Sequence, residues 1–471
     1  MMRVERDTLG EKEVPQGAYY GIQTSRALEN FPISGLRPHP RFVEATVLIK
    51  KAAAEANIAL GMLEPKIGEA IVQAADEVLA GRFSDQFVVD VFQAGAGTSH
   101  HMNVNEVLAN RAIEILGGEK GDYSWVHPND HVNMGQSTND VFPTAIRLAG
   151  LFLLRELLPA LEALEEAFEG KAEEFAQVLK SGRTHLQDAV PLTLGQELGA
   201  YAHALSRARR RIEAAGESMK ELGIGGNAVG TGLSTPPGYR EEVVARLRAY
   251  TGLELRGHRD LIEATSNTTP FAELSGSLRL LALDLIRIAN DLRLLSSGPR
   301  TGLAEIELPA IQPGSSMMPG KINPVMAEAL DMVAFQVIGN DLTLSLACQA
   351  GQLELNVMMP VMAFNLLQSM EILKNGLRLF REKCIEGIQA NEERCRQYME
   401  NSLGLATVLN PLIGYEAAAR VARRARVSGK SLREVVLEEG LLSPEALDRI
   451  LSPEYLTRPG MAAQVKEKAS V

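Results

Sequence analysis

Polar side chains suited to chemistry gather in one short segment of the 471-residue chain, from Gly314 to Pro324. The segment carries two adjacent hydroxyls, Ser315 and Ser316, followed by the cation of Lys321 and the carboxamide of Asn323. It lies between two stretches with helical periodicity, and loops held on rigid elements are where binding and catalytic groups concentrate. Because hydroxyl, ammonium and amide groups all donate hydrogen bonds, the segment predicts a loop that binds an anion.

Two glycine-rich segments do not fit nucleotide binding. In the loop, Ile322 follows Lys321 where a phosphate-binding loop has Ser or Thr, and the two glycines are one residue too far apart. The second segment, residues 223–232, contains a G-x-G-x-x-A match, but it follows a predicted helix instead of a strand. We therefore expect no nucleotide and no other cofactor.

Long helices frame the loop. Before it, apolar residues repeat with alternating spacings of four and three, as in a helix that packs lengthwise against its neighbours. This repeat comprises Leu274, Leu278, Leu281, Leu285, Ile288, Leu292 and Leu295. Similar repeats begin at Leu157 and at Met326. A fourth helix is predicted from about Leu192 to Leu222, where Gly223 ends it. Alternation with a period of two is scarce, so the sequence predicts an all-α protein.

The helical pattern predicts three domains. Residues 140–393 form an elongated bundle of long helices that carries the loop 314–324. Residues 1–139 form an N-terminal domain of shorter helices and loops, and residues 394–471 form a small helical domain. Since long helices leave much apolar surface exposed in a single subunit, we expect subunits to associate through the bundle.

Composition narrows the class of protein. Hydrophobic residues make up 45% and charged residues 23%, as in an ordinary globular chain. A net charge of -11 without runs of Lys and Arg gives no footprint for nucleic acid. No apolar stretch approaches about 18 residues, so neither a membrane span nor a secretion signal is predicted, and a cytoplasmic location is expected. Cys348, Cys384 and Cys395 lack paired spacing, which favours reduced thiols.

Two pairs of histidines raise the question of a metal site. They are His100 with His101, and His127 with His131. No cysteine or cluster of carboxylates near them completes a ligand set, so the sequence does not predict a metal.

The loop resembles, letter for letter, the G-S-S-x-x-P-x-K-x-N pattern of the fumarase/aspartase superfamily. Three further blocks match that superfamily, at residues 95–106, 127–140 and 182–188, and the resemblance covers essentially the whole chain. It implies a homotetramer with a shared multi-helix core, in which the blocks of different subunits meet in composite active sites. It also implies a small dicarboxylate as the substrate.

The chemistry of that superfamily explains the choice of residues. Removing a proton from the carbon beside a carboxylate creates a doubly charged aci-carboxylate, which needs donors placed where the second charge develops. Thr98 and the segment 137–139 are predicted at helix N-termini, whose free N-H groups and dipole favour a dicarboxylate. The substrate-binding residues implied by the resemblance are Thr98, Ser99, Ser137, Thr138, Asn139, Thr184, His185, Ser316, Lys321 and Asn323.

The resemblance also implies three catalytic residues. Ser315 matches the loop serine that the family uses as the base for the Cβ proton, and loop N-H groups with Lys321 could stabilise its alkoxide. His185 matches the active-site histidine of the fumarases. Glu328 matches the carboxylate that pairs with this histidine and fixes its tautomer. We expect His185 to bind and orient the substrate, and its part in proton transfer stays open.

Two histidines differ in how they relate to the family pattern. His101 stands where the family commonly has asparagine, so the contacts of that amide must change here. His127 belongs to the H-P-N-D block, which in the family lies near a secondary anion site.

Details of the motifs favour the aspartate ammonia-lyases within the superfamily. Class II fumarases usually carry G-S-G-T-Q-S, S-S-N-D, N-P-T-Q and N-F-E-L-N-V. This chain has G-A-G-T-S at 95–99, S-T-N-D at 137–140, N-P-V-M at 323–326 and Q-L-E-L-N-V at 352–357. The resemblance thus implies reversible elimination of ammonia from L-aspartate to give fumarate. A class II fumarate hydratase and a non-enzymatic helical scaffold remain the alternatives, and the intact loop argues against the scaffold.

Overall fold

α-Helices dominate the chain. The computed structural model describes residues 1–457, and the chain is about 63% helical. The strands in this part form four two-stranded sheets. The predicted all-α class is confirmed. Residues 458–471, the end of the predicted C-terminal domain, lie outside the described residues.

The chain divides into two compact units, each made of three segments. Unit 1 comprises Met1–Pro159, Ala208–Ala282 and Ala334–Lys374. Unit 2 comprises Ala160–Arg207, Leu283–Val333 and the described residues from Asn375 onward. The predicted division into domains 1–139, 140–393 and 394–471 stays a prediction.

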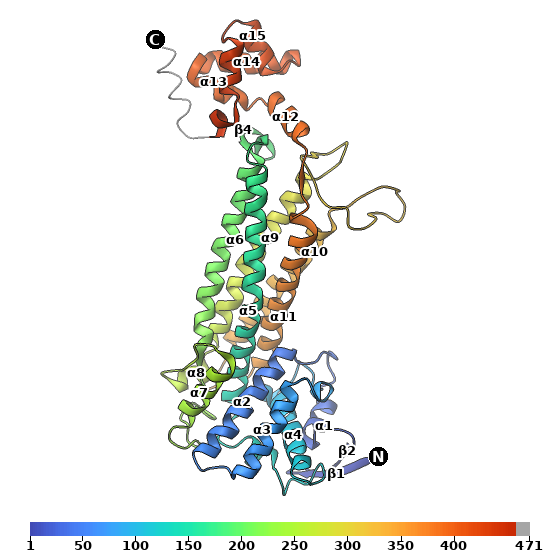
Figure 1. Cartoon of the computed structure of the whole chain (residues 1–471), viewed down its shortest axis with the longest axis vertical. Coiled ribbons are helices and arrows are strands. Elements are labelled where there is room, and N and C mark those ends of the chain that lie inside the picture. Colours follow the sequence, from blue (N-terminus) through green and yellow to red (C-terminus); the bar gives the residue numbers. More distant parts are fainter. Residues whose placement is uncertain (458–471) are drawn as a thin grey trace. The chain divides into compact units, whose positions relative to one another are not determined.

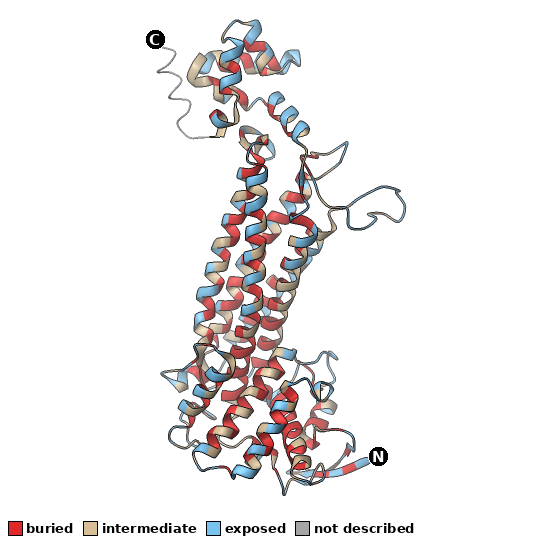
Figure 2. Ribbon diagram, viewed as in Figure 1, coloured by how far each residue is buried: buried red, intermediate tan, exposed pale blue. Residues whose placement is uncertain are grey.

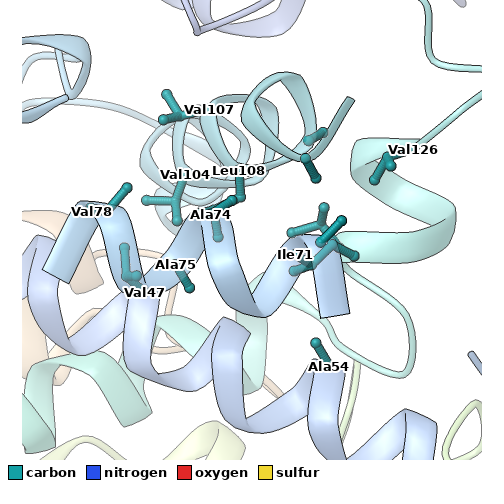
Figure 3. Packing of buried hydrophobic residues seen from close by; sticks show 14 of the residues in the cluster. Val47, Ala54, Ile71, Ala74, Ala75, Val78, Val104, Val107, Leu108 and Val126 are labelled. Carbon is teal, nitrogen blue, oxygen red and sulfur yellow. The ribbon is translucent and has the colours of Figure 1, made fainter. Parts of the chain in front are cut away.

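Unit 1 begins with an antiparallel hairpin and four helices. The hairpin pairs β1 (Met2–Asp7) with β2 (Gly10–Pro15), and the helices are α1 (Ile22–Asn30), α2 (Pro40–Ala59), α3 (Pro65–Leu79) and α4 (Thr98–Ile115). Both α2 and α3 start with proline, whose fixed φ suits the first helical turn. Small apolar side chains such as Ala74, Ala75 and Val104 pack where α2, α3 and α4 meet (Figure 3). Side chains of this size let the helices approach closely.

The longest helices of the chain are labelled in Figure 1, and each contributes one segment to unit 1 and another to unit 2. They are α5 (Thr138–Glu174), α6 (Leu194–Glu217), α9 (Thr269–Leu295), α10 (Val325–Gln349) and α11 (Met359–Phe380). Each shows a buried side and an exposed side (Figure 2). The predicted apolar repeat of α9 is buried throughout, with no member more than 5% exposed. The heptad-like spacing therefore identified the packed face correctly.

The predicted helix 192–222 is shorter in the structure. It begins at Leu194 and ends at Glu217, and a 3-10 turn (Ser218–Lys220) leads into β5 (Glu221–Leu222). β5 pairs in parallel with β6 (Arg256–Gly257), so its backbone hydrogen bonds go to another segment instead of continuing the helix. Unit 1 also contains α7 (Tyr239–Thr251) and α8 (Leu261–Ser266).

Unit 2 contains a hairpin and a cluster of short helices. The hairpin pairs β3 (Leu179–Thr184) with β4 (Gln187–Thr193), and β7 (Ile306–Glu307) pairs with β8 (Gln389–Ala390). The helices are α12 (Glu392–Asn401), α13 (Leu405–Ile413), α14 (Tyr415–Ser428), α15 (Leu432–Glu438), α16 (Pro444–Ile450) and α17 (Pro453–Thr457). They pack around their own buried core, which includes Val421, Val435 and Ile450.

Across residues 1–457, none of the helices has both the length and the apolar composition that a membrane span needs.

Candidate active site

Two helix N-termini in unit 1 bring predicted hydroxyl groups together. Thr98 is the first residue of α4 and Thr138 is the first residue of α5. Their Oγ1 atoms lie 3.4 Å apart, and the Oγ1 of Thr98 donates a hydrogen bond to the carbonyl of Gly95 at 2.6 Å. Thr98 is exposed and Thr138 is half-buried. A helix N-terminus presents free N-H groups and a partial positive charge, so two of them meeting here suit an anion.

The close approach of these two helices depends on Gly97. This residue precedes α4 with a φ of +97°, a left-handed conformation that glycine adopts without strain. A Cβ atom at this position would lie 2.1 Å from the ring of Phe142 in α5. A larger residue would therefore push the start of α4 away from α5.

A buried carboxylate, Asp140, fixes the start of α5. Its oxygens accept hydrogen bonds from the backbone N-H groups of Ser137 at 3.0 Å, Gly225 at 3.1 Å and Asn227 at 2.8 Å. Burial raises the pKa of Asp140 to about 6, although the three N-H groups favour its charged form. The glycine-rich turn that follows β5 is thereby tied to the candidate site.

The neighbouring residues complete this N-terminus. The Oγ of Ser137 accepts a hydrogen bond from the backbone N-H of Asn139 at 3.2 Å. The Nδ2 of Asn139 donates to the carbonyl of Ala228 at 2.8 Å. Ser137, Thr138 and Asn139 thus share the turn at which α5 begins, where the sequence predicts a helix start.

A polar cluster behind Thr138 was missed by sequence reasoning. Lys50 of α2 is fully buried, and its Nζ donates to Oδ1 of Asn133 at 2.9 Å and to Oε1 of Gln136 at 2.8 Å. The same Nζ makes a short hydrogen bond with Nε2 of His101, whose Nδ1 lies 2.7 Å from Oγ1 of Thr138. Burial lowers the pKa of both Lys50 and His101 well below the ordinary values. The only signal in the sequence was His101 at a position where the family commonly has asparagine.

Ser99 follows Thr98 in the first turn of α4. It lines a cavity of about 660 Å³ in unit 1 together with Arg6, Arg26 and His127. Within residues 1–457, no hydrogen bond links Ser99 to Thr98. Its predicted role in substrate binding stays a prediction.

In unit 2, the predicted anion-binding loop is closed on itself. The backbone N-H of Gly314 donates to the carbonyl of Lys321 at 2.8 Å, and Nδ2 of Asn323 donates to the carbonyl of Gly314 at 2.5 Å. A Cβ at Gly314 would lie 2.4 Å from that Lys321 oxygen, so only glycine permits this closure. Ser316 and Lys321 are exposed at the loop surface.

Asn323 and Pro324 have the residue types of a helix N-cap followed by proline at the first helical position, but Asn323 does not cap the next helix. Helix α10 begins at Val325, and the carbonyl of Pro324 accepts the first intrahelical bond, from Glu328 at 3.2 Å. The side chain of Asn323 is turned toward Gly314, so it joins the two ends of the loop.

The hydroxyl of Ser315 accepts hydrogen bonds from the backbone of its own loop. Its Oγ accepts hydrogen bonds from the backbone N-H groups of Met317 at 3.1 Å and Met318 at 2.9 Å. This is the geometry of a serine turn. The same two donors also stabilise negative charge on the oxygen, which favours an alkoxide.

His185 occupies a tight turn between β3 and β4. His185 and Leu186 both have positive φ, at 55° and 58°, a conformation that favours glycine or asparagine. Such strained positions are concentrated at functional sites. Thr184 and His185 are exposed. Arg183 holds the hairpin in place through hydrogen bonds of 3.0 and 2.8 Å to the buried carboxylate of Glu305.

The predicted pairing of His185 with Glu328 is not seen in unit 2. No hydrogen bond or ion pair joins these residues in the part of the chain that the structure describes. The family resemblance implies that the matching blocks come from different subunits, so the pairing stays a prediction.

No group of three His, Cys, Asp or Glu side chains among residues 1–457 is arranged to hold a metal ion. His127 instead accepts hydrogen bonds at its Nδ1 from the backbone N-H groups of Asn129 and Asp130, each at 3.2 Å.

Comparison with known proteins places these features in a family. Residues 10–339 match a family model described as Lyase, and residues 405–458 match one described as Fumarase C C-terminus. An aspartate ammonia-lyase from Bacillus subtilis (strain 168) is 55% identical over 462 residues, which are 98% of this chain and 97% of the relative.

Solved structures share the fold over nearly the whole chain. A fumarate lyase:delta crystallin from Brucella melitensis bound to cobalt has a TM-score of 0.95 at 49% identity, covering 98% of this chain and 100% of that one. A class II fumarase from Schistosoma mansoni has a TM-score of 0.92 at 40% identity, with the same coverage.

Proposed function

Because the chain belongs to the lyase family whose model matches residues 10–339, we propose that it is an aspartate ammonia-lyase, a carbon-nitrogen lyase. It converts L-aspartate reversibly to fumarate and ammonia. The observation that carries the proposal is the near full-length similarity to an aspartate ammonia-lyase, in a chain that keeps Ser315, Lys321 and Asn323 in one closed loop.

Ser315 acts as the base in this proposal. Its Oγ already accepts two backbone hydrogen bonds, from Met317 and Met318, and these donors lower the cost of removing its proton. The resulting alkoxide takes the proton from Cβ of L-aspartate. Lys321 is exposed in the same loop and supplies positive charge for one substrate carboxylate.

Charge that develops on the second carboxylate is held by the helix N-termini of unit 1. As Cβ loses its proton, its electron pair spreads into the adjacent carboxylate and forms an aci-carboxylate. The hydroxyl of Thr138 and the first N-H groups of α4 and α5 are donors fixed before the reaction begins, which is the arrangement that lowers such a barrier. Collapse of the aci-carboxylate then expels ammonia from Cα and leaves fumarate.

We further propose that the active enzyme is a homotetramer in which one subunit supplies the loop and others supply the helix N-termini and His185. Support comes from α10, which exposes Phe335 at 56%, Leu342 at 63% and Leu346 at 54%. These residues are spaced by seven and four, so they share one face of the helix. An exposed apolar face of this kind suits association with further copies. A cytoplasmic location fits an enzyme of this chemistry.

The alternative function is hydration of fumarate to L-malate. The similarity to a class II fumarase supports this alternative, since hydration of fumarate and addition of ammonia to fumarate pass through the same type of carbanion. The test offers L-aspartate and L-malate separately to the full-length protein and follows fumarate by its ultraviolet absorbance. We expect fumarate from L-aspartate alone. Fumarate from L-malate alone would identify a hydratase, and no fumarate from either would contradict both lyase functions.

A further inference from the structure

The amide groups around Lys50 have a fixed orientation. The Nδ2 of Asn133 donates to the carbonyl of Gln136 at 3.2 Å, and the Nε2 of Gln136 donates to the carbonyls of Val132 at 3.1 Å and Met134 at 3.2 Å. Both amide oxygens must therefore face the Nζ of Lys50, at 2.9 and 2.8 Å. They accept two of the three N-H bonds of a lysine ammonium group.

The third N-H of Lys50 fixes the tautomer of His101. Lys50 is 0% exposed, and the atom that remains near its Nζ is the Nε2 of His101. With Lys50 in its ammonium form, which has no lone pair and can only donate, Nε2 is the unprotonated nitrogen. The neutral imidazole then carries its proton on Nδ1. Burial lowers the pKa of Lys50, and the carboxylate of Asp140, held by its three backbone N-H donors, opposes that shift and favours the ammonium form.

The protonated Nδ1 of His101 sets the direction of the Thr138 hydroxyl. It lies 2.7 Å from Oγ1 of Thr138 and donates to it, so the hydroxyl proton must point elsewhere. Thr98 directs its own hydroxyl proton to the carbonyl of Gly95. The proton of Thr138 is therefore available to a ligand at the N-terminus of α5.

We propose that Lys50 and His101 are positioning residues, which form a buried hydrogen-bond relay that holds Thr138 as a donor to a carboxylate of the substrate. The inference rests on the proposed function for the identity of that carboxylate. Each bond in the relay polarises the next, so the charge of Lys50 strengthens the donor at Thr138. The imidazole of His101 contacts both Lys50 and Thr138 because its two ring nitrogens face different neighbours.

A pair of substitutions at His101 tests the relay. His101→Leu removes both hydrogen bonds and keeps an apolar side chain of similar size. His101→Gln supplies an Oε1 that accepts from Lys50 and an Nε2 that donates to Thr138. We expect His101→Leu to lower kcat/KM for L-aspartate roughly tenfold or more, and His101→Gln to recover most of that loss. An equal loss in both variants would overturn the relay.

A double-mutant cycle separates the relay from a purely structural role of His101. If His101 acts through Thr138, His101→Leu has no further effect on kcat/KM in a Thr138→Val background. If the two losses multiply independently, the proposal is wrong. Circular dichroism and thermal unfolding of each variant verify that the protein is folded.

Succinate makes the test independent of turnover. This dicarboxylate lacks the amine and cannot react, so its Kd measured by calorimetry reports only carboxylate binding. The relay predicts the same pattern across the variants: roughly tenfold weaker binding for His101→Leu and recovery for His101→Gln. If the wild type releases no fumarate but succinate shows this pattern, the proposed function fails and the relay stands. If the wild type is active and succinate binds all variants equally, the relay fails.

Discussion

The Oγ1 of Thr24 lies 2.6 Å from Oε2 of Glu106, and it is one of several donors that surround this buried carboxylate at the start of α1. The backbone N-H groups of Gly21, Gln23 and Thr24 donate to it at 2.8, 2.8 and 3.1 Å. All of these groups donate, so the acceptor-only carboxylate is the side chain that satisfies them together. Glu106 thereby joins α4 to the free N-terminal N-H groups of α1.

Replacing Glu106 with Gln should destabilise the protein by about 1–3 kcal/mol, because the amide NH₂ would face N-H donors and leave one of them without an acceptor. The measurement is urea unfolding followed by circular dichroism at about pH 8.5, because burial raises the pKa of Glu106 to about 7 and the carboxyl group must be charged to accept from all of its donors. Glu119→Gln, at an exposed site on the loop after α4, is the matched control and should change stability little. Equal stability of the wild type and the Glu106→Gln variant would contradict this account.

A buried histidine predicts how stability depends on pH. His100 stacks on Phe42 with ring centroids 4.6 Å apart, and burial lowers its pKa to about 3. Between these two pKa values, the unfolded chain, with an ordinary histidine pKa near 6.5, therefore binds a proton that the folded chain does not bind. This contribution to stability is complete above about pH 6.5 and is lost as the pH falls toward 3.

We expect His100→Phe to lose less stability than the wild type when the pH falls from 7 to 4, by up to about 1.4 kcal/mol per pH unit. Thermal unfolding across this range measures the difference. The exposed His203 provides the control, since His203→Phe should follow the wild-type curve. Parallel curves for wild type and His100→Phe would show that His100 titrates normally in the folded protein.

The carboxylate of Glu305 compensates two cations in unit 2. It is 0% exposed and lies 3.0 Å from Nζ of Lys180 and 2.8 Å from the guanidinium of Arg183. Glu305→Gln removes the negative charge that these two cations share, so we expect a loss of about 3–5 kcal/mol in stability. Differential scanning calorimetry gives the shift in Tm. The exposed Glu307→Gln is the control, and a Glu305→Gln protein as stable as that control would refute the ion-pair argument.

Removing the loop cation should weaken both binding and turnover. Lys321→Ala eliminates a charge that contacts the carboxylate in the ground state and the transition state, so KM should rise and kcat should fall, with roughly a 100-fold loss in kcat/KM. Steady-state kinetics with L-aspartate measure both constants. Lys66→Ala removes an exposed lysine near the start of α3 and should leave them unchanged. An unchanged kcat/KM in Lys321→Ala would exclude Lys321 from the site.

The sequence predicted the features that depend on local pattern. The spacing of leucines in α9 identified its buried face, and the helix starts at Thr98 and Thr138 were correctly placed. Features set by tertiary contacts were not predictable in this way. Lys50 has the composition of a surface residue, yet the packing of α2 buries it among three acceptors.

Backbone pairing between distant segments was equally unpredictable from the sequence. The local sequence predicts that Leu222 belongs to a helix, but in the structure Leu222 pairs with Gly257 as a strand. Nothing near Leu222 in the sequence indicates that pairing. Asn323 followed the local rule for a helix cap, whereas closure of the loop onto Gly314 used its side chain for another bond. Matching to a family implied the roles of the site residues, and those roles stay predictions until variants are measured.

The central claim, that Ser315 takes the Cβ proton, is tested most directly by comparing kcat for L-aspartate in Ser315→Ala and Ser316→Ala. Both variants lose one hydroxyl from the same loop, but only the Oγ of Ser315 accepts the two backbone hydrogen bonds. We predict a loss of roughly 1,000-fold or more in Ser315→Ala, as expected when a catalytic base is removed, and less than about tenfold in Ser316→Ala. Turnover in a folded Ser315→Ala protein close to that of the wild type would contradict the claim.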